Sequence, residues 1–369
     1  MTVQAEPSGP LSPAQAAAVA HVRSVALAER PAALACIASM VAVAEHPPQR
    51  LLLAIARRGR LTLNFHPDRP CADGRTVAAA LAEDGVYRSQ FVTGISNGLL
   101  MPSAGSDRDR WEWRMFGGAY QRVGVLPADR PVYGGLNLLD HPDGACPRFG
   151  SCHFRLRPAV LARATFCLGD SHLGPRMVGT IDGFEAVLAG LLTGTVATGV
   201  CLGRAGTDVA TLARTLLSSV PDAPATSSAM GRALDDYVEA QVHGTLDLAR
   251  DVEALVVDPS FIGTPVGETL EHIAHHYGCR LVRHRGFALP PDRVDPEFRG
   301  PAIPELAARV HAEFARPGEL VAAALIGRAA ASVVTDPDRW ADRGPTSVTL
   351  QHLKQLWHVL VRYGAPHTS

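Results

Sequence analysis

Alternating apolar and polar residues predict β-strands along the middle of the chain. In LTLNFH, Leu61, Leu63 and Phe65 alternate with polar residues, which is typical of a strand with one buried face. Alternation or a short apolar run predicts further strands in YGGLNLL (133–139), SCHFRLR (151–157), ATFCLGDSH (164–172), DYVEAQVHG (236–244) and DVEALVVDPS (251–260).

Helical patterns surround and interrupt these strands. The Ala- and Leu-rich residues 13–58 predict two or three helices, broken at Pro31 and at Pro47–Pro48. Further helices are expected at 76–83, 183–217 and 265–277, and from 304 to the end. Short strands interrupted by helices predict an α+β fold with mixed strand pairing. We expect a tail and helices in 1–59, the core in 60–300 and a helical extension in 301–369.

Three of the predicted strands carry several polar side chains on one face. These residues are Asn64 and His66; Ser151, His153 and Arg155; and Tyr237, Glu239, Gln241 and His243. Such a face can simply contact solvent. However, none of the three contains lysine, and side chains able to hydrogen-bond a ligand dominate. This composition favours a shared cleft.

Composition and charge narrow the classes of function. The 35 basic and 36 acidic side chains give a net charge of −1. This balance provides no positive electrostatic potential to attract nucleic acid or an anionic membrane. The first residues lack a secretory-signal pattern, and the apolar run 186–203 reads better as a buried helix than as a membrane span. Seven scattered cysteines without a CxxC pair favour a reducing cytoplasm and no structural zinc. No Gly-rich phosphate loop is present, which argues against Rossmann and P-loop folds.

Several long runs resemble a known family. NFHPDR, YRSQFVTGISNG, DRDRWEWRMFGGAY, YGGLNLLDHPDGACPRFGSCHFRLRP and TFCLGDSH occur in this order. Together they are similar to the bacterial domain-of-unknown-function family number 3626, over most of residues 60–300. That family has no established activity, so the resemblance identifies related proteins but implies no function.

A second resemblance suggests a chemistry. YVEAQVHGTLDLARDVEALVV is similar to the last motif of ADP-ribosyltransferase toxins. The resemblance implies an ADP-ribosyltransferase-like core with NAD as the substrate and Glu239 as the catalytic glutamate. It places His66 on the first strand, where it would hold the adenosine ribose with Arg69 close by. Gln241 and His243 would face the acceptor, an unknown protein or small molecule.

The middle position of the toxin pattern stays open. Tyr87 or Tyr133 would match a His-Tyr-Glu pattern, whereas Ser89 or Ser96 would match a serine pattern. An aromatic such as Tyr87 could stack on nicotinamide. Backbone donors of TGISNG could bind its amide or the pyrophosphate; the residues concerned are Thr93, Gly94, Ser96 and Asn97. Tyr237 stands where arginine-modifying enzymes carry Glu or Gln, which argues against arginine as the acceptor.

The chemistry of NAD cleavage fits a glutamate held on a strand. Cleavage of the nicotinamide–ribose bond passes through an oxocarbenium-like state, as in glycoside hydrolysis. A carboxylate bound to the neighbouring ribose hydroxyl strengthens its hold as positive charge develops. The expected activity is therefore ADP-ribosyl transfer, or NAD hydrolysis if water is the acceptor.

Simpler and competing interpretations remain. His66 could cap its loop through Asp68, TGISNG could be only a turn, and Glu239 could be a surface carboxylate. A metal-dependent hydrolase could use His272, His275 and His276. That cluster lacks the HExxH glutamate, and histidines at a helix C-terminus are favourable in any case, so no metal is expected.

A non-enzymatic interaction protein is the other alternative. Trp111, Trp113, Phe116 and Tyr120 could anchor a partner. Equally, Trp111 and Phe116 could form the packed face of an amphipathic helix.

Overall fold

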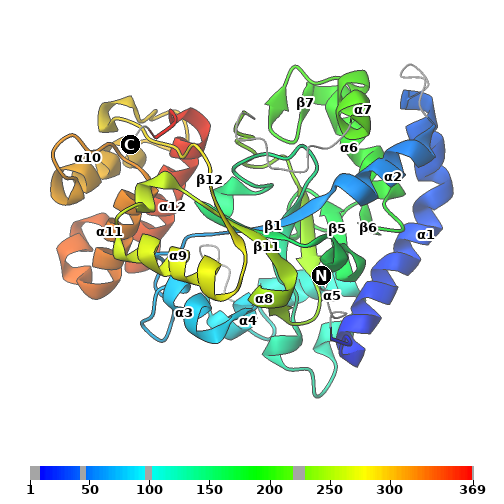
Figure 1. Ribbon diagram of the computed structural model, residues 1–369, viewed down its shortest axis with the longest axis horizontal. Coiled ribbons are helices and arrows are strands. Elements are labelled where there is room, and N and C mark those ends of the chain that lie inside the picture. Colours follow the sequence, from blue (N-terminus) through cyan, green and yellow to red (C-terminus); the bar gives the residue numbers. More distant parts are fainter. Residues whose placement is uncertain (1–8, 42–46, 96–101, 219–228, 368–369) are drawn as a thin grey trace.

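An eight-stranded mixed sheet crosses the molecule (Figure 1). The computed structural model describes residues 9–41, 47–95, 102–218 and 229–367. The strand order is β12-β11-β4-β1-β3-β9-β5-β6, and β11 and β12 form the parallel pair. The strands are β1 (Arg60–Phe65), β3 (Val132–Asn137), β4 (Cys152–Leu156), β5 (Ala164–Leu168), β6 (Val178–Thr180), β9 (Val238–Val242), β11 (Val252–Val257) and β12 (Arg280–Arg283).

Helices cover the sheet at both ends, so the molecule has the α+β class that the sequence predicts. At the β6 end, α1 contacts α6 and β6, and α2 contacts α7. At the other end, α10, α11 and α12 pack on one another (Figure 1). The helices are α1 (Pro13–Val41), α2 (Pro48–Arg58), α3 (Val77–Asp84), α4 (Gln90–Thr93), α5 (Asp107–Phe116), α6 (Glu185–Thr198), α7 (Val209–Leu217), α8 (Leu248–Asp251), α9 (Pro265–His276), α10 (Ala302–Phe314), α11 (Ala323–Thr335) and α12 (Thr346–Tyr363).

Shorter elements connect these helices and strands. Two small antiparallel sheets pair β2 (Val86–Tyr87) with β10 (Leu246–Asp247), and β7 (Val200–Cys201) with β8 (Arg204–Ala205). The single-turn or slightly longer 3-10 helices are η2 (Ala119–Gln121), η3 (Pro127–Asp129), η4 (Pro147–Phe149), η5 (Pro158–Arg163), η6 (Ser171–Leu173), η7 (Pro259–Phe261), η8 (Pro291–Arg293) and η9 (Pro337–Arg343).

The break expected at Pro31 is wrong, because Pro31 lies inside α1, a continuous helix of 29 residues. Pro31 is exposed, whereas Ala26, Ala33 and Ile37 on either side are buried. Packing of these residues on the β6 end of the molecule outweighs the lost backbone hydrogen bond.

The helix expected over 183–217 is divided by a hairpin. Between α6 and α7, Leu202 and Gly203 both have positive φ, 50° and 83°. Positive φ at both central residues is characteristic of a type I′ turn, whose twist matches that of the two strands it connects, β7 and β8.

The segment after residue 300 shares the core of the sheet. Leu325 of α11 and Trp357 and Leu360 of α12 belong to the same buried cluster as Leu63 of β1 and Leu255 of β11. The C-terminal helices are therefore in position to contribute to a site on the sheet.

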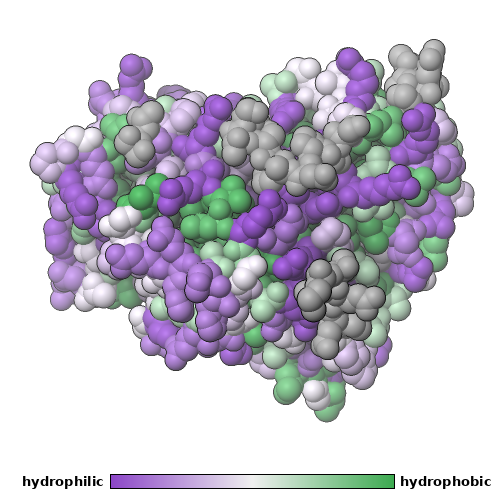
Figure 2. Space-filling view, in the orientation of Figure 1, coloured by the Kyte–Doolittle hydropathy of each residue, from purple (hydrophilic) through white to green (hydrophobic). Residues whose placement is uncertain are grey.

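One helix among the described residues, α1, is long and apolar enough to cross a membrane by length and composition. This is weak evidence, because core helices and signal sequences meet the same criterion. The face shown in Figure 2 is mostly hydrophilic, and hydrophilic and hydrophobic residues are mixed along the side where α1 lies. The expectation of no membrane contact stays a prediction.

Candidate functional site

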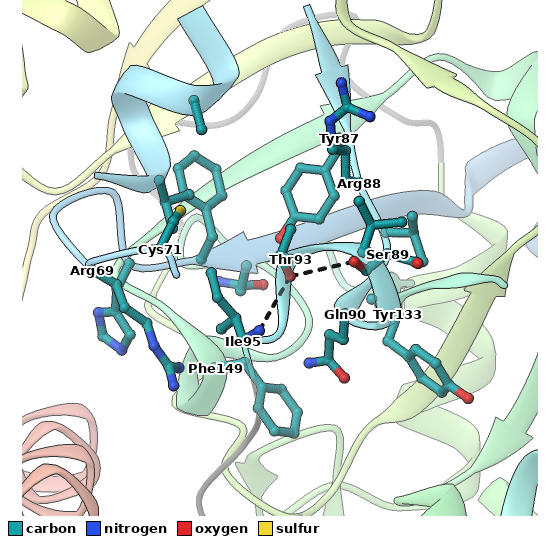
Figure 3. A pocket seen from close by; sticks show the side chains of 18 of the residues that line it. Arg69, Cys71, Tyr87, Arg88, Ser89, Gln90, Thr93, Ile95, Tyr133 and Phe149 are labelled. Carbon is teal, nitrogen blue, oxygen red and sulfur yellow. Dashed lines mark hydrogen bonds between the residues drawn. The ribbon is translucent and has the colours of Figure 1, made fainter. Parts of the chain in front are cut away.

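A cavity of about 560 Å³ lies between the end of β1, the segment around β2 and α4, and the strands β3 and β9. Turn η4, turn η6 and helix α12 complete its wall. Arg69, Tyr87 and Phe149 point toward this space from different segments (Figure 3). Its volume is within the range of sites for small molecules and cofactors, roughly 300–1,000 Å³.

Glu239 lies at the inner wall of the cavity. It is the second residue of β9 and pairs with Gly135 of β3 on one side and Cys167 of β5 on the other. Only 5% of Glu239 is exposed. Its Oε1 accepts a hydrogen bond of 2.7 Å from Gln241 Nε2, and its Oε2 accepts a longer one from Ser171 N at 3.4 Å.

Burial, followed by the negative charge of Asp170, raises the pKa of Glu239 to about 7. The hydrogen bonds from Ser171 and Gln241 favour the carboxylate and partly oppose this rise. The alternative interpretation of Glu239 as a surface carboxylate is therefore wrong. A glutamate that titrates near neutral pH inside a cavity is a candidate catalytic group.

Glycine at position 135 lets a loop approach Glu239. A Cβ on Gly135 would lie 2.4 Å from Cys146 Sγ and 2.7 Å from Ala145 Cβ. Polar side chains of β1 hold this loop, since Thr62 Oγ1 accepts from Ala145 N and Asn64 Nδ2 donates to Asp143 O. The polar face expected on β1 therefore mainly anchors the cavity wall.

Behind Glu239, a chain of buried hydrogen bonds runs along the sheet. The Gln241 amide accepts from Thr165 Oγ1 at 2.9 Å, and Thr165 Oγ1 lies 3.0 Å from His243 Nε2. His243 Nδ1 lies 2.5 Å from Tyr120 Oη. Every link is satisfied if His243 carries its proton on Nε2, which is the tautomer that the network implies. Burial, with Arg163 nearby, lowers the pKa of His243 to about 3, so it is neutral.

Gln241 and His243 consequently do not face the cavity. Both are fully buried, and neither is among the residues that line the cavity. Residues 119–121 of η2 bring Tyr120 over the end of β9, which fills the space expected for the acceptor. Gln241 and His243 lie beneath Glu239, and this position indicates that they orient its carboxyl group.

His66 and Arg69 line the cavity where the chain leaves β1. The His66 ring packs edge-on against Trp357 of α12, with ring centroids 5.4 Å apart. Burial, together with the positive charges of Arg69 and Lys354, lowers the pKa of His66 to about 3. His66 is therefore neutral and can both donate and accept a hydrogen bond.

Both tyrosine candidates for the middle position line the cavity. Tyr87 packs edge-on against Phe65 and Phe154, with centroids 6.1 Å from each. Tyr133 lies on β3, between β1 and β9, and its hydroxyl donates to Glu112 Oε1 at 2.8 Å. Ser89 also reaches the cavity, but its hydroxyl donates to Pro127 O at 2.9 Å.

The TGISNG segment is described only in part. Gly94 ends α4 in the left-handed conformation, with φ 66°, so the turn interpretation holds there. Thr93 and Ile95 line the cavity, and Thr93 Oγ1 contacts Ser89 O and Ile95 N at 3.3 Å each (Figure 3). Ser96 and Asn97 lie outside the described residues.

Comparison with protein families gives a match over most of the chain. The model of the family DUF3626, described as a protein of unknown function, matches residues 60–363. The chain belongs to DUF3626. The match extends from β1 through α12 and so includes every residue that lines the cavity. The chain matches none of the curated proteins with which it was compared.

The cavity contains charged residues that the sequence analysis did not assign to an NAD site. Asp170 binds His172 Nδ1 at 2.7 Å and lies 4.0 Å from Arg148 Nη1. Burial acts to raise the pKa of Asp170, but the hydrogen bond and charge of His172 outweigh it and lower the pKa. Lys354 reaches the cavity from α12. The sequence alone could have drawn attention to Lys354, because it is the only lysine of the chain.

Two other sets of polar residues considered in the sequence analysis lie away from the cavity. Ser151, His153 and Arg155 do not line it, and Arg155 instead pairs with Asp140 at 3.2 Å. The shared cleft expected for that strand is therefore wrong. His272, His275 and His276 are exposed on α9, and the described residues contain no group of three or more His, Cys, Asp or Glu side chains placed to hold a metal ion.

The helix α5 buries Trp111 and Phe116 and exposes 58% of Trp113. The amphipathic-helix interpretation of this segment is confirmed for these residues. Tyr120 is buried in the hydrogen-bond chain and so cannot anchor a partner.

Proposed function

We propose that the cavity binds NAD and that Glu239 promotes cleavage of its nicotinamide–ribose bond. ADP-ribose then passes to an acceptor nucleophile or to water. The observation that carries this proposal is a single buried carboxyl group on β9 facing a cavity of suitable volume, about 560 Å³. His66, Tyr87 and Tyr133 line the same space, as expected from the resemblance to ADP-ribosyltransferases.

The environment of Glu239 suits the charge that develops in this reaction. When the N-glycosidic bond breaks, its electron pair leaves with nicotinamide and the ribose becomes an oxocarbenium-like cation. The Glu239 carboxylate has no cationic partner within 4.0 Å among the described residues. An unneutralised carboxylate in a site of low polarity interacts strongly with a nearby cation. The raised pKa of Glu239 has the same origin.

The other lining residues fit supporting roles in this proposal. Neutral His66 can exchange hydrogen bonds with the hydroxyls of a ribose. Tyr87 presents a ring next to Phe65, where a flat nicotinamide could stack. The chain from Tyr120 to Gln241 would keep the Glu239 carboxyl group in place through the reaction.

The first test is release of nicotinamide from NAD by the purified full-length protein, with and without EDTA. We expect release that EDTA does not change and that Glu239→Gln lowers by about 100-fold or more, because the positioned charge is lost. Glu305→Gln, at a carboxylate that is 78% exposed on α10, is the matched control and should leave the rate unchanged.

Glu239→Gln also separates the enzyme from a protein that only binds the ligand. Under the proposal, the variant keeps its fold and raises its thermal midpoint with NAD as the wild type does. Full activity of Glu239→Gln, or loss of activity with EDTA, would contradict the proposed role of Glu239.

A further inference from the structure

Lys354 has an unusual place in this protein. The chain has 35 lysine and arginine residues, and Lys354 is the only lysine among them. It lies on α12 and lines the cavity. Arginine therefore occupies every other cationic position of the chain, and the one ammonium group faces the candidate site.

Lys354 has cationic neighbours and no carboxylate partner within the described part of the chain. No described carboxylate lies within 4.0 Å of its Nζ, which lies over the Phe149 ring, 5.8 Å from the ring centroid. Burial lowers the pKa of Lys354 to about 8, and the charges of Arg148, Arg69 and Arg299 contribute, while Asp170 acts in the opposite direction. A partly buried ammonium group among arginines is costly without an anion.

Arg148 is the cation best placed to share an anion with Lys354. It lines the same cavity, and its Nε is buried without a hydrogen-bond partner in the described structure. Its Nη1 pairs with Asp235 at 2.5 Å, and Asp170 lies at 4.0 Å. Arg148 also stacks on Phe149, with its guanidinium carbon 5.0 Å from the ring centroid. Lys354 and Arg148 therefore flank one aromatic ring.

Helix α12 fixes the positions of Lys354 and Arg148 relative to each other. Trp357 Nε1 donates to Pro147 O at 2.7 Å, and His358 Nε2 lies 3.2 Å from Arg148 O. Residues 354, 357 and 358 share one face of a helix because of their i, i+3, i+4 spacing. The same helix face thus positions the ammonium group and anchors the turn that carries Arg148.

We propose that Lys354 and Arg148 form a binding subsite for the phosphate or pyrophosphate group of a small ligand. A compact ammonium group and a guanidinium fork together suit a phosphate with several oxygens. The enclosed position of Lys354 favours a small ligand over an acidic protein surface. The subsite extends the proposed function, since NAD carries a pyrophosphate, but it does not require the chemistry at Glu239.

Calorimetric titration with inorganic pyrophosphate tests the subsite on the full-length protein. We expect Lys354→Met to weaken binding by about tenfold or more, because a charge-assisted contact is lost, and Lys354→Arg to keep part of the affinity. Arg362→Met removes an exposed cation from the same helix and should change the affinity less than twofold, by about 0.4 kcal/mol. Wild-type affinity in Lys354→Met, or equal weakening in Arg362→Met, would overturn the proposal.

The single lysine allows a second measurement that does not depend on a variant. An amine-specific acetylating reagent modifies only Lys354 among the side chains, and mass spectrometry of the peptide around it gives the rate. Pyrophosphate should slow this modification severalfold. An unchanged rate at a pyrophosphate concentration that saturates the calorimetric signal would show that the anion binds elsewhere.

Parallel titration with ADP-ribose identifies the source of the phosphate. Tighter binding of ADP-ribose than of pyrophosphate, with both weakened in Lys354→Met, supports a nucleotide ligand; equal binding supports a free phosphate compound. Lys354-dependent pyrophosphate binding without any nicotinamide release would refute the proposed function and leave the subsite in place. Nicotinamide release with the same KM for NAD in Lys354→Met would refute the subsite alone.

Discussion

At the scale of single residues, the proposed chemistry depends on the protonation state of Glu239. Its pKa is raised to about 7 by burial and by Asp170. The proposal requires the carboxylate, so kcat/KM for nicotinamide release should rise with pH below 7 and level off above it. The slope should approach about tenfold per pH unit on the acidic side. A profile that is flat between pH 5.5 and 8.5 would contradict the role of this group.

The hydrogen bond from Gln241 lowers that midpoint relative to an unbonded carboxyl group. Gln241 Nε2 donates to Glu239 Oε1 at 2.7 Å and lowers its pKa. Removing the donor in Gln241→Met destabilises the carboxylate, so the midpoint of the profile should move up by about one pH unit. Gln355→Met, on α12 and away from the cavity lining, should leave the midpoint in place. A downward shift would show that another group controls the rate.

Thr165 connects two buried polar groups and is expected to affect stability. Thr165→Val leaves the Gln241 carbonyl and His243 Nε2 without the partner they share. Each buried unsatisfied group costs about 1–3 kcal/mol, so the free energy of unfolding should fall by that order. Urea denaturation at pH 7 measures the loss. Thr335→Val, at an exposed helix end, is the control and should change stability by less than about 0.5 kcal/mol.

Sequence periodicity identified the polar face of β9 but not what covers it. Alternation correctly placed Val238, Ala240 and Val242 in the core, with Glu239 and Gln241 on the opposite face. It could not show that Tyr120, more than a hundred residues earlier, closes that face. Both side chains are buried, but Glu239 lines the cavity and Gln241 lies beneath it.

At the scale of elements, α1 offers a direct test of helix energetics. Pro31 lies inside α1 and is exposed. Pro31→Ala restores a backbone hydrogen bond and relieves the ring clash, so the protein should gain up to about 3 kcal/mol. Urea denaturation of Pro31→Ala is compared with Ala28→Gly, an exposed position of the same helix, which should lose about 1 kcal/mol. A destabilised Pro31→Ala would mean that the packing of α1 requires a kink there.

Long periodic elements could be predicted, whereas the shortest ones could not. The strand patterns at 61–66 and 251–260 and the helical pattern at 265–277 correspond to β1, β11 and α9, with ends that differ by up to three residues. The hairpin of β7 and β8 has two residues per strand, too few for any periodicity. β12 is mostly exposed and polar, and its parallel pairing with β11 defines it. Such elements depend on tertiary pairing, which local patterns do not contain.

At the scale of the whole molecule, the cavity is assembled from distant segments. Glu239 comes from the middle of the sheet, His66 from the end of β1 and Lys354 from the C-terminal helix. Sequence analysis placed residues 301–369 in a separate extension because a helical pattern does not reveal where a helix docks. The hydrogen bond from Trp357 to Pro147 joins this segment to the wall of the cavity.

A cavity built in this way should couple ligand binding to global stability. A ligand that contacts only the folded protein adds about 2.7 kcal/mol at 100 times its Kd. For a chain of this length, the thermal midpoint should therefore rise by about 3–4 °C with NAD, ADP-ribose or pyrophosphate. Glu239→Gln should keep the shift with NAD, because the substitution removes a charge needed for the reaction and preserves the shape of the wall.

The same thermal measurement separates a ligand cavity from the interaction-protein alternative. Lys354→Met should lose most of the shift with pyrophosphate, whereas Arg362→Met should retain it. EDTA should change none of these shifts, since no described cluster is placed to hold a metal ion. Midpoints that stay constant with all three ligands at millimolar concentration would contradict both the NAD site and the phosphate subsite. The exposed Trp113 of α5 would then become the first position to probe for a protein partner.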